Sequence, residues 1–198
     1  MNRLLLVLQL LSVTLIWPLQ VRATPQSPEA VVATTTEQVM QVLRDDAIAT
    51  DKAATVGALE HAVMPHIDLQ RISQRLLGDH WLSATIEQQQ RFAGQFRKLL
   101  VKTYAAVLQQ YTNAKIAYLP GQTDPNANVA TVKSRVTGDS GSPVAIDYRL
   151  RQQGGEWKLF DVALNGVSLL ANYRGSFGKW ANTMGIDGLT DALAARNR

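Results

Sequence analysis

Side chains able to perform acid–base or metal chemistry are few in this sequence and widely spaced. It contains three histidines, His61, His66 and His80, and no cysteine, so disulfides, thiol nucleophiles and thiolate metal sites are ruled out. Zinc sites of the metalloprotease type place two histidines four residues apart on one helical face, whereas His61 and His66 are five residues apart. We therefore expect packed or surface histidines and no metal site.

Residues 138–143, which read G-D-S-G-S-P, resemble the surroundings of the nucleophilic serine in chymotrypsin-like proteases. A serine nucleophile needs a histidine base that a carboxylate orients. None of the three histidines has the neighbours typical of that base, and the segment falls between two predicted strands, where a plain loop is required. We interpret the segment as a connecting loop and expect no catalytic residues.

Asp161 is the carboxylate of greatest chemical interest. It lies on a predicted strand face shared with Trp157 and Leu159, so we expect it to be partly buried. In a wet cavity a buried carboxylate can act as a general base, which would fit a small-cavity isomerase or hydrolase. The alternative, which we favour, is a structural acid that accepts hydrogen bonds from backbone N–H groups or from an arginine.

The strand that carries Asp161 is the centre of the predicted fold. Its residues alternate, with one face formed by Lys158, Phe160, Val162 and Leu164 and the other by Trp157, Leu159, Asp161 and Ala163. Both faces are largely apolar, so we expect both to be covered. The dipeptide Asn165-Gly166 should then turn the chain, and Ser168 should cap a helix over residues 169–180.

Three further strands are predicted before it, over residues 116–119, 129–136 and 144–151. The connections between them are short enough for hairpins, and residues 152–156 form the last of these turns. We therefore expect a four-stranded antiparallel meander.

Helices are predicted ahead of the strands, with start signals at Ser27, Asp51, Asp68 and Thr85. The helix from Thr85 to about Tyr111 carries an apolar arc and, roughly opposite, a basic stripe of Arg91, Lys98 and Lys102. The stripe is either a solvated face or a docking surface for anionic lipid or an acidic partner. Helices followed by strands indicate an α+β fold.

The first residues have the pattern of an export signal. An apolar run over residues 4–17 precedes Val21-Arg22-Ala23, which fits a signal-peptidase site. The run is shorter than the roughly twenty residues of a membrane span, although an uncleaved anchor is the alternative. We predict a signal peptide over residues 1–23 and a single domain over residues 24–198. The formal net charge of +4, reduced by the two arginines of the leader, gives no reason to expect nucleic-acid binding.

Residues 157–174, W-K-L-F-D-V-A-L-N-G-V-S-L-L-A-N-Y-R, are followed by G-I-D-G-L at residues 185–189. Together they resemble the signature of the MlaC family, the periplasmic phospholipid carriers of Gram-negative bacteria that are also called toluene-tolerance auxiliary components. The stretch L-L-G-D-H-W-L-S-A-T at residues 76–85 extends the resemblance. No single piece is a catalytic fingerprint, but the ordered set is specific and covers most of the predicted mature chain.

The resemblance implies a periplasmic carrier that moves glycerophospholipids between the outer and inner membranes, without bond chemistry and without a cofactor. It implies N-terminal helices packed on a curved four-stranded sheet around an apolar lipid cavity, with C-terminal helices. The implied partners are phospholipid, an inner-membrane MCE-domain protein of an ABC lipid transporter, and an outer-membrane lipoprotein–porin complex. The sequence has no P-loop motif, so a partner must supply the energy.

The residues expected to contact lipid come from the helix arc (Phe96, Leu99, Leu100 and Tyr104) and the inner sheet face (Val132, Val144, Ile146, Tyr148 and Leu150), and Leu76, Phe160, Val162 and Val167 are expected to join them. Two other functions stay open on the residues alone. One is a small-cavity enzyme that uses Asp161, which needs a polar cavity. The other is an envelope adaptor that binds proteins, which needs a filled core and an exposed apolar patch.

Overall fold

The computed structural model describes residues 26–121, 127–138 and 141–198. The predicted signal peptide, residues 1–23, lies outside the described residues, as do Asp139 and Ser140 of the G-D-S-G-S-P segment. Across the described ranges every helix is too short or too polar to span a bilayer.

The described chain runs from helices through a sheet to a long helix, which confirms the predicted α+β class. The helical segments are α1 (Pro28–Arg44), α2 (Asp46–Ala49), α3 (Lys52–Val63), the 3₁₀ turn η1 (Met64–His66), α4 (Leu69–Leu77), α5 (Asp79–Leu82), α6 (Ile86–Leu108), the 3₁₀ turn η2 (Gln109–Tyr111) and α7 (Leu169–Arg196). The predicted caps are confirmed, because a first-turn backbone N–H donates to each of the side chains of Ser27, Asp51, Asp68, Thr85 and Ser168.

The sheet is an antiparallel meander of five strands, β1 (Lys115–Tyr118), β2 (Val129–Thr137), β3 (Pro143–Gln153), β4 (Glu156–Leu164) and β5 (Val167–Ser168). The meander is confirmed, but the predicted number of four strands was wrong. Asn165 (φ 48°) and Gly166 (φ 84°) form a two-residue hairpin turn, after which β5 pairs with the end of β4. A strand of two residues is too short to produce a periodic pattern in the sequence.

A β-bulge in β4 changes which side chains face the helices. Arg149 pairs with Asp161 while the next residue, Leu150, pairs with Leu159, so Phe160 is an extra residue. Strict alternation through β4 was therefore a wrong prediction. The inner face of β4, which faces the helices, is formed on both sides of the bulge by Trp157, Leu159, Val162 and Leu164.

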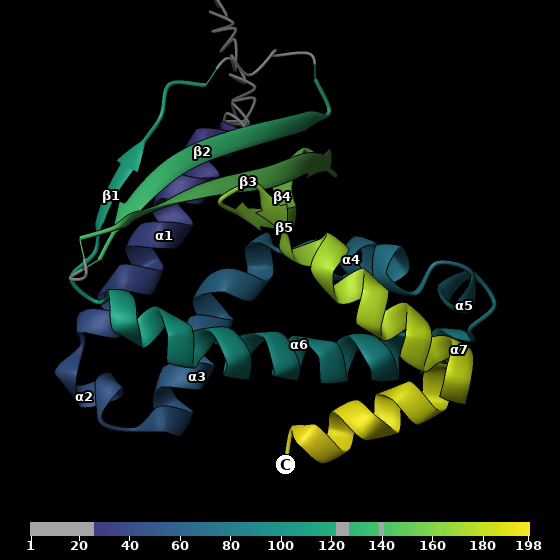
Figure 1. Cartoon of the computed structure of the whole chain (residues 1–198). Coiled ribbons are helices and arrows are strands. Elements are labelled where there is room, and N and C mark those ends of the chain that lie inside the picture. The colour runs from purple at the N-terminus through teal and green to yellow at the C-terminus, as the bar shows by residue number, and fades with distance from the viewer. Residues whose placement is uncertain (1–25, 122–126, 139–140) are drawn as a thin grey trace, which may run out of the picture.

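Figure 1 shows how the helices lie around the sheet. Helix α1 packs against one face of the sheet, and α6 crosses the molecule beneath that face. Helix α7 leaves β5, runs down to the end of α6 that lies beside α5, and then turns back beneath α6. The chain thus joins the sheet to α6 through η2 and β1, and to α7 through β5.

The turn within α7 lies at Gly185, whose backbone has φ 69° and ψ 178°. Such a positive φ is readily adopted by glycine and strained for other residues. The predicted helix end at Trp180 was too early, because a helix resumes after Gly185 and continues to Arg196. The G-I-D-G-L segment is the start of this returning half.

The returning half of α7 covers much of the basic stripe. Arg91 pairs with Asp187 at 3.1 Å and with Asp191 at 2.9 Å, and the Lys102 ammonium donates to the carbonyl of Asn197. Two of the three stripe residues therefore attach α7 to α6, while Lys98 is exposed. A helical pattern shows which residues share a face but not which later helix packs on that face. The sequence therefore could not show that Arg91 and Lys102 contact α7.

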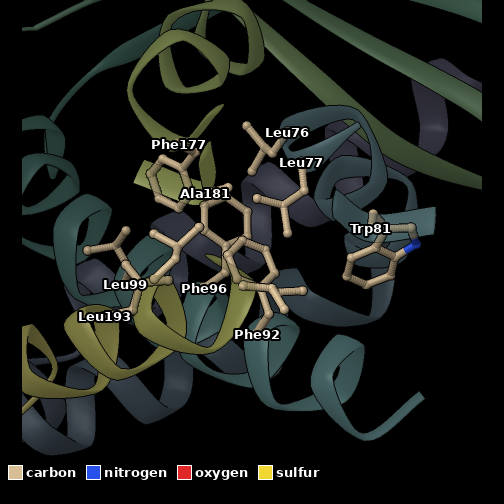
Figure 2. Packing of buried hydrophobic residues seen from close by; sticks show 11 residues of the cluster. Leu76, Leu77, Trp81, Phe92, Phe96, Leu99, Phe177, Ala181 and Leu193 are labelled. Atoms are coloured by element: carbon tan, nitrogen blue, oxygen red, sulfur yellow. The ribbon is translucent and has the colours of Figure 1, made fainter. Parts of the chain in front are cut away.

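Aromatic side chains fill the contact between α4, α5, α6 and α7, which we call the helical core. Figure 2 shows Phe92 and Phe96 of α6 at its centre, with Phe177 of α7 and Trp81 of α5 around them. Phe92 and Phe96 stack with ring centroids 5.8 Å apart, and Phe177 meets Phe92 edge-on at 6.1 Å. Phe92 is fully buried. The cluster packs the first half of α6 against both halves of α7.

A second core lies between α1 and one end of the inner sheet face. Its members are Val31, Val32, Ala130, Val132, Leu150 and Trp157. All of them are buried, and none of them lines either of the two cavities described below, so we call this half of the sheet face the closed half.

Candidate functional site

The other half of the inner sheet face borders an apolar cavity of about 380 Å³. Its walls come from α1, α3, α4, α6 and α7 and from the first four strands. Apart from Thr36, four tyrosines and Asp161, every lining side chain is apolar. A volume of this size lies within the range of small-molecule sites.

The sheet side of the cavity is built by strand alternation. Val144, Ile146 and Tyr148 follow one another at every second position of β3 and line the cavity, while the next such residue, Leu150, lies in the closed half. Val162 and Leu164 extend the wall onto β4. These residues pair across the strands, Ile146 with Leu164 and Tyr148 with Val162.

The helix side is built by helical spacing. Positions 96, 100, 104 and 108 of α6 lie four residues apart, so they form one stripe that faces the cavity. Helix α1 presents Val39, Met40 and Leu43, which are buried, and the first turns of α7 add Leu169, Leu170 and Tyr173. The wall contributed by α7 begins directly after β5.

The structure brings nine of the thirteen expected lipid-contact residues together at the cavity: Leu76, Phe96, Leu100, Tyr104, Val144, Ile146, Tyr148, Phe160 and Val162. The other four lie elsewhere. Leu99 is buried in the helical core, Val132 and Leu150 belong to the closed half, and Val167 on β5 is 63% exposed.

Sequence reasoning missed the contributions of α1 and α3 to the wall, and of α4 it named only Leu76. Met40 and Leu43 of α1, Leu59 of α3 and Ile72 of α4 all line the cavity. The apolar stripe of α1 was visible in the sequence as Val39, Val42 and Leu43. It indicated a buried face but not the element against which that face packs.

The rim of the cavity lies where the C-terminal part of α6 approaches the first turns of α7. Val107 of α6 lines the cavity and is 45% exposed, and Tyr104 and Tyr173 are partly exposed there. Their hydroxyl oxygens are 3.4 Å apart. Burial raises the pKa of Tyr104 and of Tyr148, so both phenols stay uncharged at neutral pH. The tyrosines therefore add polarity to the wall but no charge.

Asp161 is held by donors on three sides. It accepts hydrogen bonds from the hydroxyl of Ser168 at 2.7 Å, from the backbone N–H of Leu170 at 3.1 Å and from the Arg149 guanidinium at 3.0 Å. Its side chain is 3% exposed. The interpretation of Asp161 as an acid that accepts from backbone and arginine is confirmed, and it attaches the start of α7 to the sheet.

The three histidines lie apart from the cavity. His61 is exposed on α3, and His80 contacts Asn182 with 2.7 Å between Nε2 and Oδ1. His66, in η1, is partly buried, and this burial lowers its pKa. In the described part of the chain no group of three or more acidic or histidine side chains is placed to hold a metal ion.

A second depression, of about 510 Å³, lies among α1, α2, α3 and η1. Its walls mix apolar side chains with polar ones such as Gln38, Gln41 and His61, and it is more open to solvent than the apolar cavity. We regard the smaller apolar cavity as the candidate site, because enclosed apolar walls with few polar groups are typical of ligand sites.

Known proteins resemble this chain over most of its length. The family model described as MlaC protein matches residues 33–195. The chain is 31% identical over 155 residues to the toluene tolerance protein Ttg2D of Pseudomonas putida, covering 77% of this chain and 72% of that protein. It is 27% identical over 130 residues to the binding protein MlaC of the intermembrane phospholipid transport system of Haemophilus influenzae, covering 64% of this chain and 61% of that protein.

A solved structure has a similar fold. It is that of a phospholipid-binding protein from Ralstonia solanacearum in complex with a phospholipid. The TM-score is 0.79 at 30% sequence identity, and the match covers 87% of this chain and 97% of that one.

The family match begins within α1 and ends within α7. It therefore contains every residue that lines the apolar cavity, from Thr36 to Tyr173. On the extent of this match, the chain belongs to the MlaC family.

Proposed function

We propose that this protein carries a glycerophospholipid with its acyl tails in the apolar cavity and its head group in water at the α6–α7 rim. The observation that carries the proposal is the partly enclosed apolar cavity, whose walls are uncharged except for Asp161, which is held by three donors. The phospholipid in the similar Ralstonia solanacearum structure supports the same class of ligand.

The partly exposed rim bears on how the tails enter. The cavity of about 380 Å³ is reached between α6 and α7, where Val107, Tyr104 and Tyr173 are exposed in part. We infer that the acyl tails pass in and out of the cavity at this rim.

The energetics fit a shuttle between membranes. Burying each methylene gains ~0.8 kcal/mol relative to water, so two tails gain on the order of 20 kcal/mol, but a bilayer provides the same gain. Transfer between membrane and carrier is therefore near balance, and contacts with partners must direct loading and unloading.

Family membership and the site also support proposals about the partners and the chemistry of this protein. We propose that the partners are an inner-membrane MCE-domain protein of an ABC lipid transporter and an outer-membrane lipoprotein–porin complex, which exchange lipid with the carrier in the periplasm. We also propose that the protein is not an enzyme and needs no cofactor. In support, the Asp161 carboxylate already accepts from Arg149 of β3, from the Ser168 hydroxyl and from the Leu170 N–H of α7, which leaves it poorly suited to act as a base.

Native mass spectrometry of the purified protein tests the carrier proposal directly. We expect a mass increment that denaturation releases as intact phospholipid. An unliganded protein that instead binds another envelope protein through an apolar surface would support the adaptor, and turnover of a bound small molecule would support the enzyme. Either result would overturn the carrier proposal.

Export to the periplasm has its own test. If residues 1–23 are a signal peptide, N-terminal sequencing of protein released from the periplasm should begin at Thr24, directly after Val21-Arg22-Ala23. Recovery of the intact chain in the membrane fraction would contradict cleavage and favour an anchor.

A further inference from the structure

The inner face of the sheet is divided into an open half, which borders the cavity, and the closed half, and the division is seen on β3, β4 and α1. On β3, positions 144, 146 and 148 line the cavity and Leu150 does not. On α1, the residues from Thr36 onwards line the cavity, whereas Val31 and Val32 belong to the closed half. The same boundary appears on β4, where Leu159 lines the cavity and Trp157 does not.

Tyr148 stands on this boundary. It lines the cavity on one side and packs against the closed half on the other, and Leu159 does the same from β4. On β2 its pairing partner is Val132, which is only 2% exposed within the closed half. The ring of Tyr148 therefore separates open space from packed side chains.

We propose that Tyr148 is the floor of the cavity and sets the length of acyl tail that the protein accepts, an inference that rests on the proposed lipid-carrying function. A tail that enters at the α6–α7 rim runs along Ile146 toward Tyr148. To pass the ring it would have to displace side chains of the closed half, and such a core has no spare volume.

A floor predicts a plateau in binding affinity. Each added methylene that leaves water should raise affinity about fourfold until the end of the tail reaches Tyr148, after which further methylenes should add little. The probe is a series of lysophosphatidylcholines whose single tails lengthen by steps of two carbons. Their dissociation constants are measured on the delipidated full-length mature protein.

The decisive variant is Tyr148→Ala, which removes a ring with the volume of about three or four methylenes. We expect its plateau to move to tails longer by about two to four carbons. Tyr148→Phe keeps the ring and should keep the wild-type plateau. Leu150→Ala, a matched deletion on the same strand behind the floor, should lower stability and also keep the wild-type plateau.

The outcomes separate this inference from the carrier proposal. If the wild-type protein binds no lysophosphatidylcholine and copurifies with no phospholipid, the carrier proposal fails. If the wild-type protein binds both but Tyr148→Ala keeps the wild-type plateau, the floor is not Tyr148. A plateau that moves equally in Leu150→Ala would place the tail inside the closed half and would also overturn the inference. Circular dichroism confirms that each variant is folded before it is compared.

Discussion

Replacing Ile146 by glutamate should give a folded protein that retains less than about a tenth of the lipid bound by the wild type. Ile146 lies between Val144 and Tyr148 on the β3 wall of the cavity and is only partly buried. A carboxylate there stands among acyl tails without a partner, and an unpaired charge in an apolar site is costly. Because the cavity is open space, water can replace the tails, so the fold should survive while lipid binding does not.

The matched control is Val132→Glu, the same substitution on the same face of the sheet. Val132 is 2% exposed in the closed half, where no cavity can admit water. The buried charge should therefore destabilise the fold itself, by several kcal/mol, which is a large fraction of the usual 5–15 kcal/mol margin. Thermal unfolding and native mass spectrometry on both variants give the comparison.

The two variants together test the division of the sheet. Loss of lipid from a stable Ile146→Glu variant, beside strong destabilisation of Val132→Glu, would support it. If Ile146→Glu unfolds as readily as Val132→Glu, the space beside β3 is a packed core in solution. If it stays folded and still holds lipid, the tails bind on another face.

Much of the fold was predictable because local rules and tertiary contacts agree. Each predicted helix start depends on a side chain that accepts from a backbone N–H only two or three residues later. Such local signals can be recognised in the sequence, as they were at Ser27, Asp51, Asp68 and Thr85. The hairpin connections likewise fixed the order of the meander.

The site was less predictable, since a cavity and a core use the same residue types. Ile146 and Leu150 lie on the same face of β3 and are both branched aliphatic residues, yet one borders open space and the other is packed against α1. The difference depends on how far α1 reaches along the sheet, which no pattern within β3 contains. The bulge at Phe160 could not be predicted for a similar reason. Which β4 side chains face the helices depends on how β4 pairs with β3, and the sequence of β4 alone does not contain that pairing.

Replacing Asp161 by alanine should destabilise the protein by about 3 kcal/mol and speed the release of bound lipid. The substitution leaves the Leu170 N–H, the Ser168 hydroxyl and the Arg149 guanidinium without their shared acceptor. Hydrogen bonds to a charged acceptor contribute ~1.5–3 kcal/mol, and a buried donor left unpaired adds to the loss. The Arg149 side chain is partly exposed, so water can solvate its guanidinium once Asp161 is gone. The loss of stability should therefore lie at the lower end of the range for removing one partner of a buried ion pair.

The effect on lipid follows from what Asp161 holds in place. Leu169, Leu170 and Tyr173, in the first turns of α7, form one wall of the cavity and reach the rim, and Asp161 attaches these turns to β4. Once released, they can move away from α6 more often, so the rim should open more often. Urea unfolding measures the loss of stability, and transfer of a fluorescent phospholipid from the loaded protein to vesicles measures release.

Ser27→Ala is the control, because it removes a helix cap that is far from the rim. The Ser27 hydroxyl accepts from the backbone N–H of Ala30 at 3.1 Å at the start of α1, and its loss should cost about 1 kcal/mol without changing lipid release. Faster release in Asp161→Ala but not in Ser27→Ala would tie release to the start of α7 rather than to stability in general. Unchanged release in an Asp161→Ala variant that has lost the expected stability would mean that the carboxylate supports the fold and that the rim opens elsewhere.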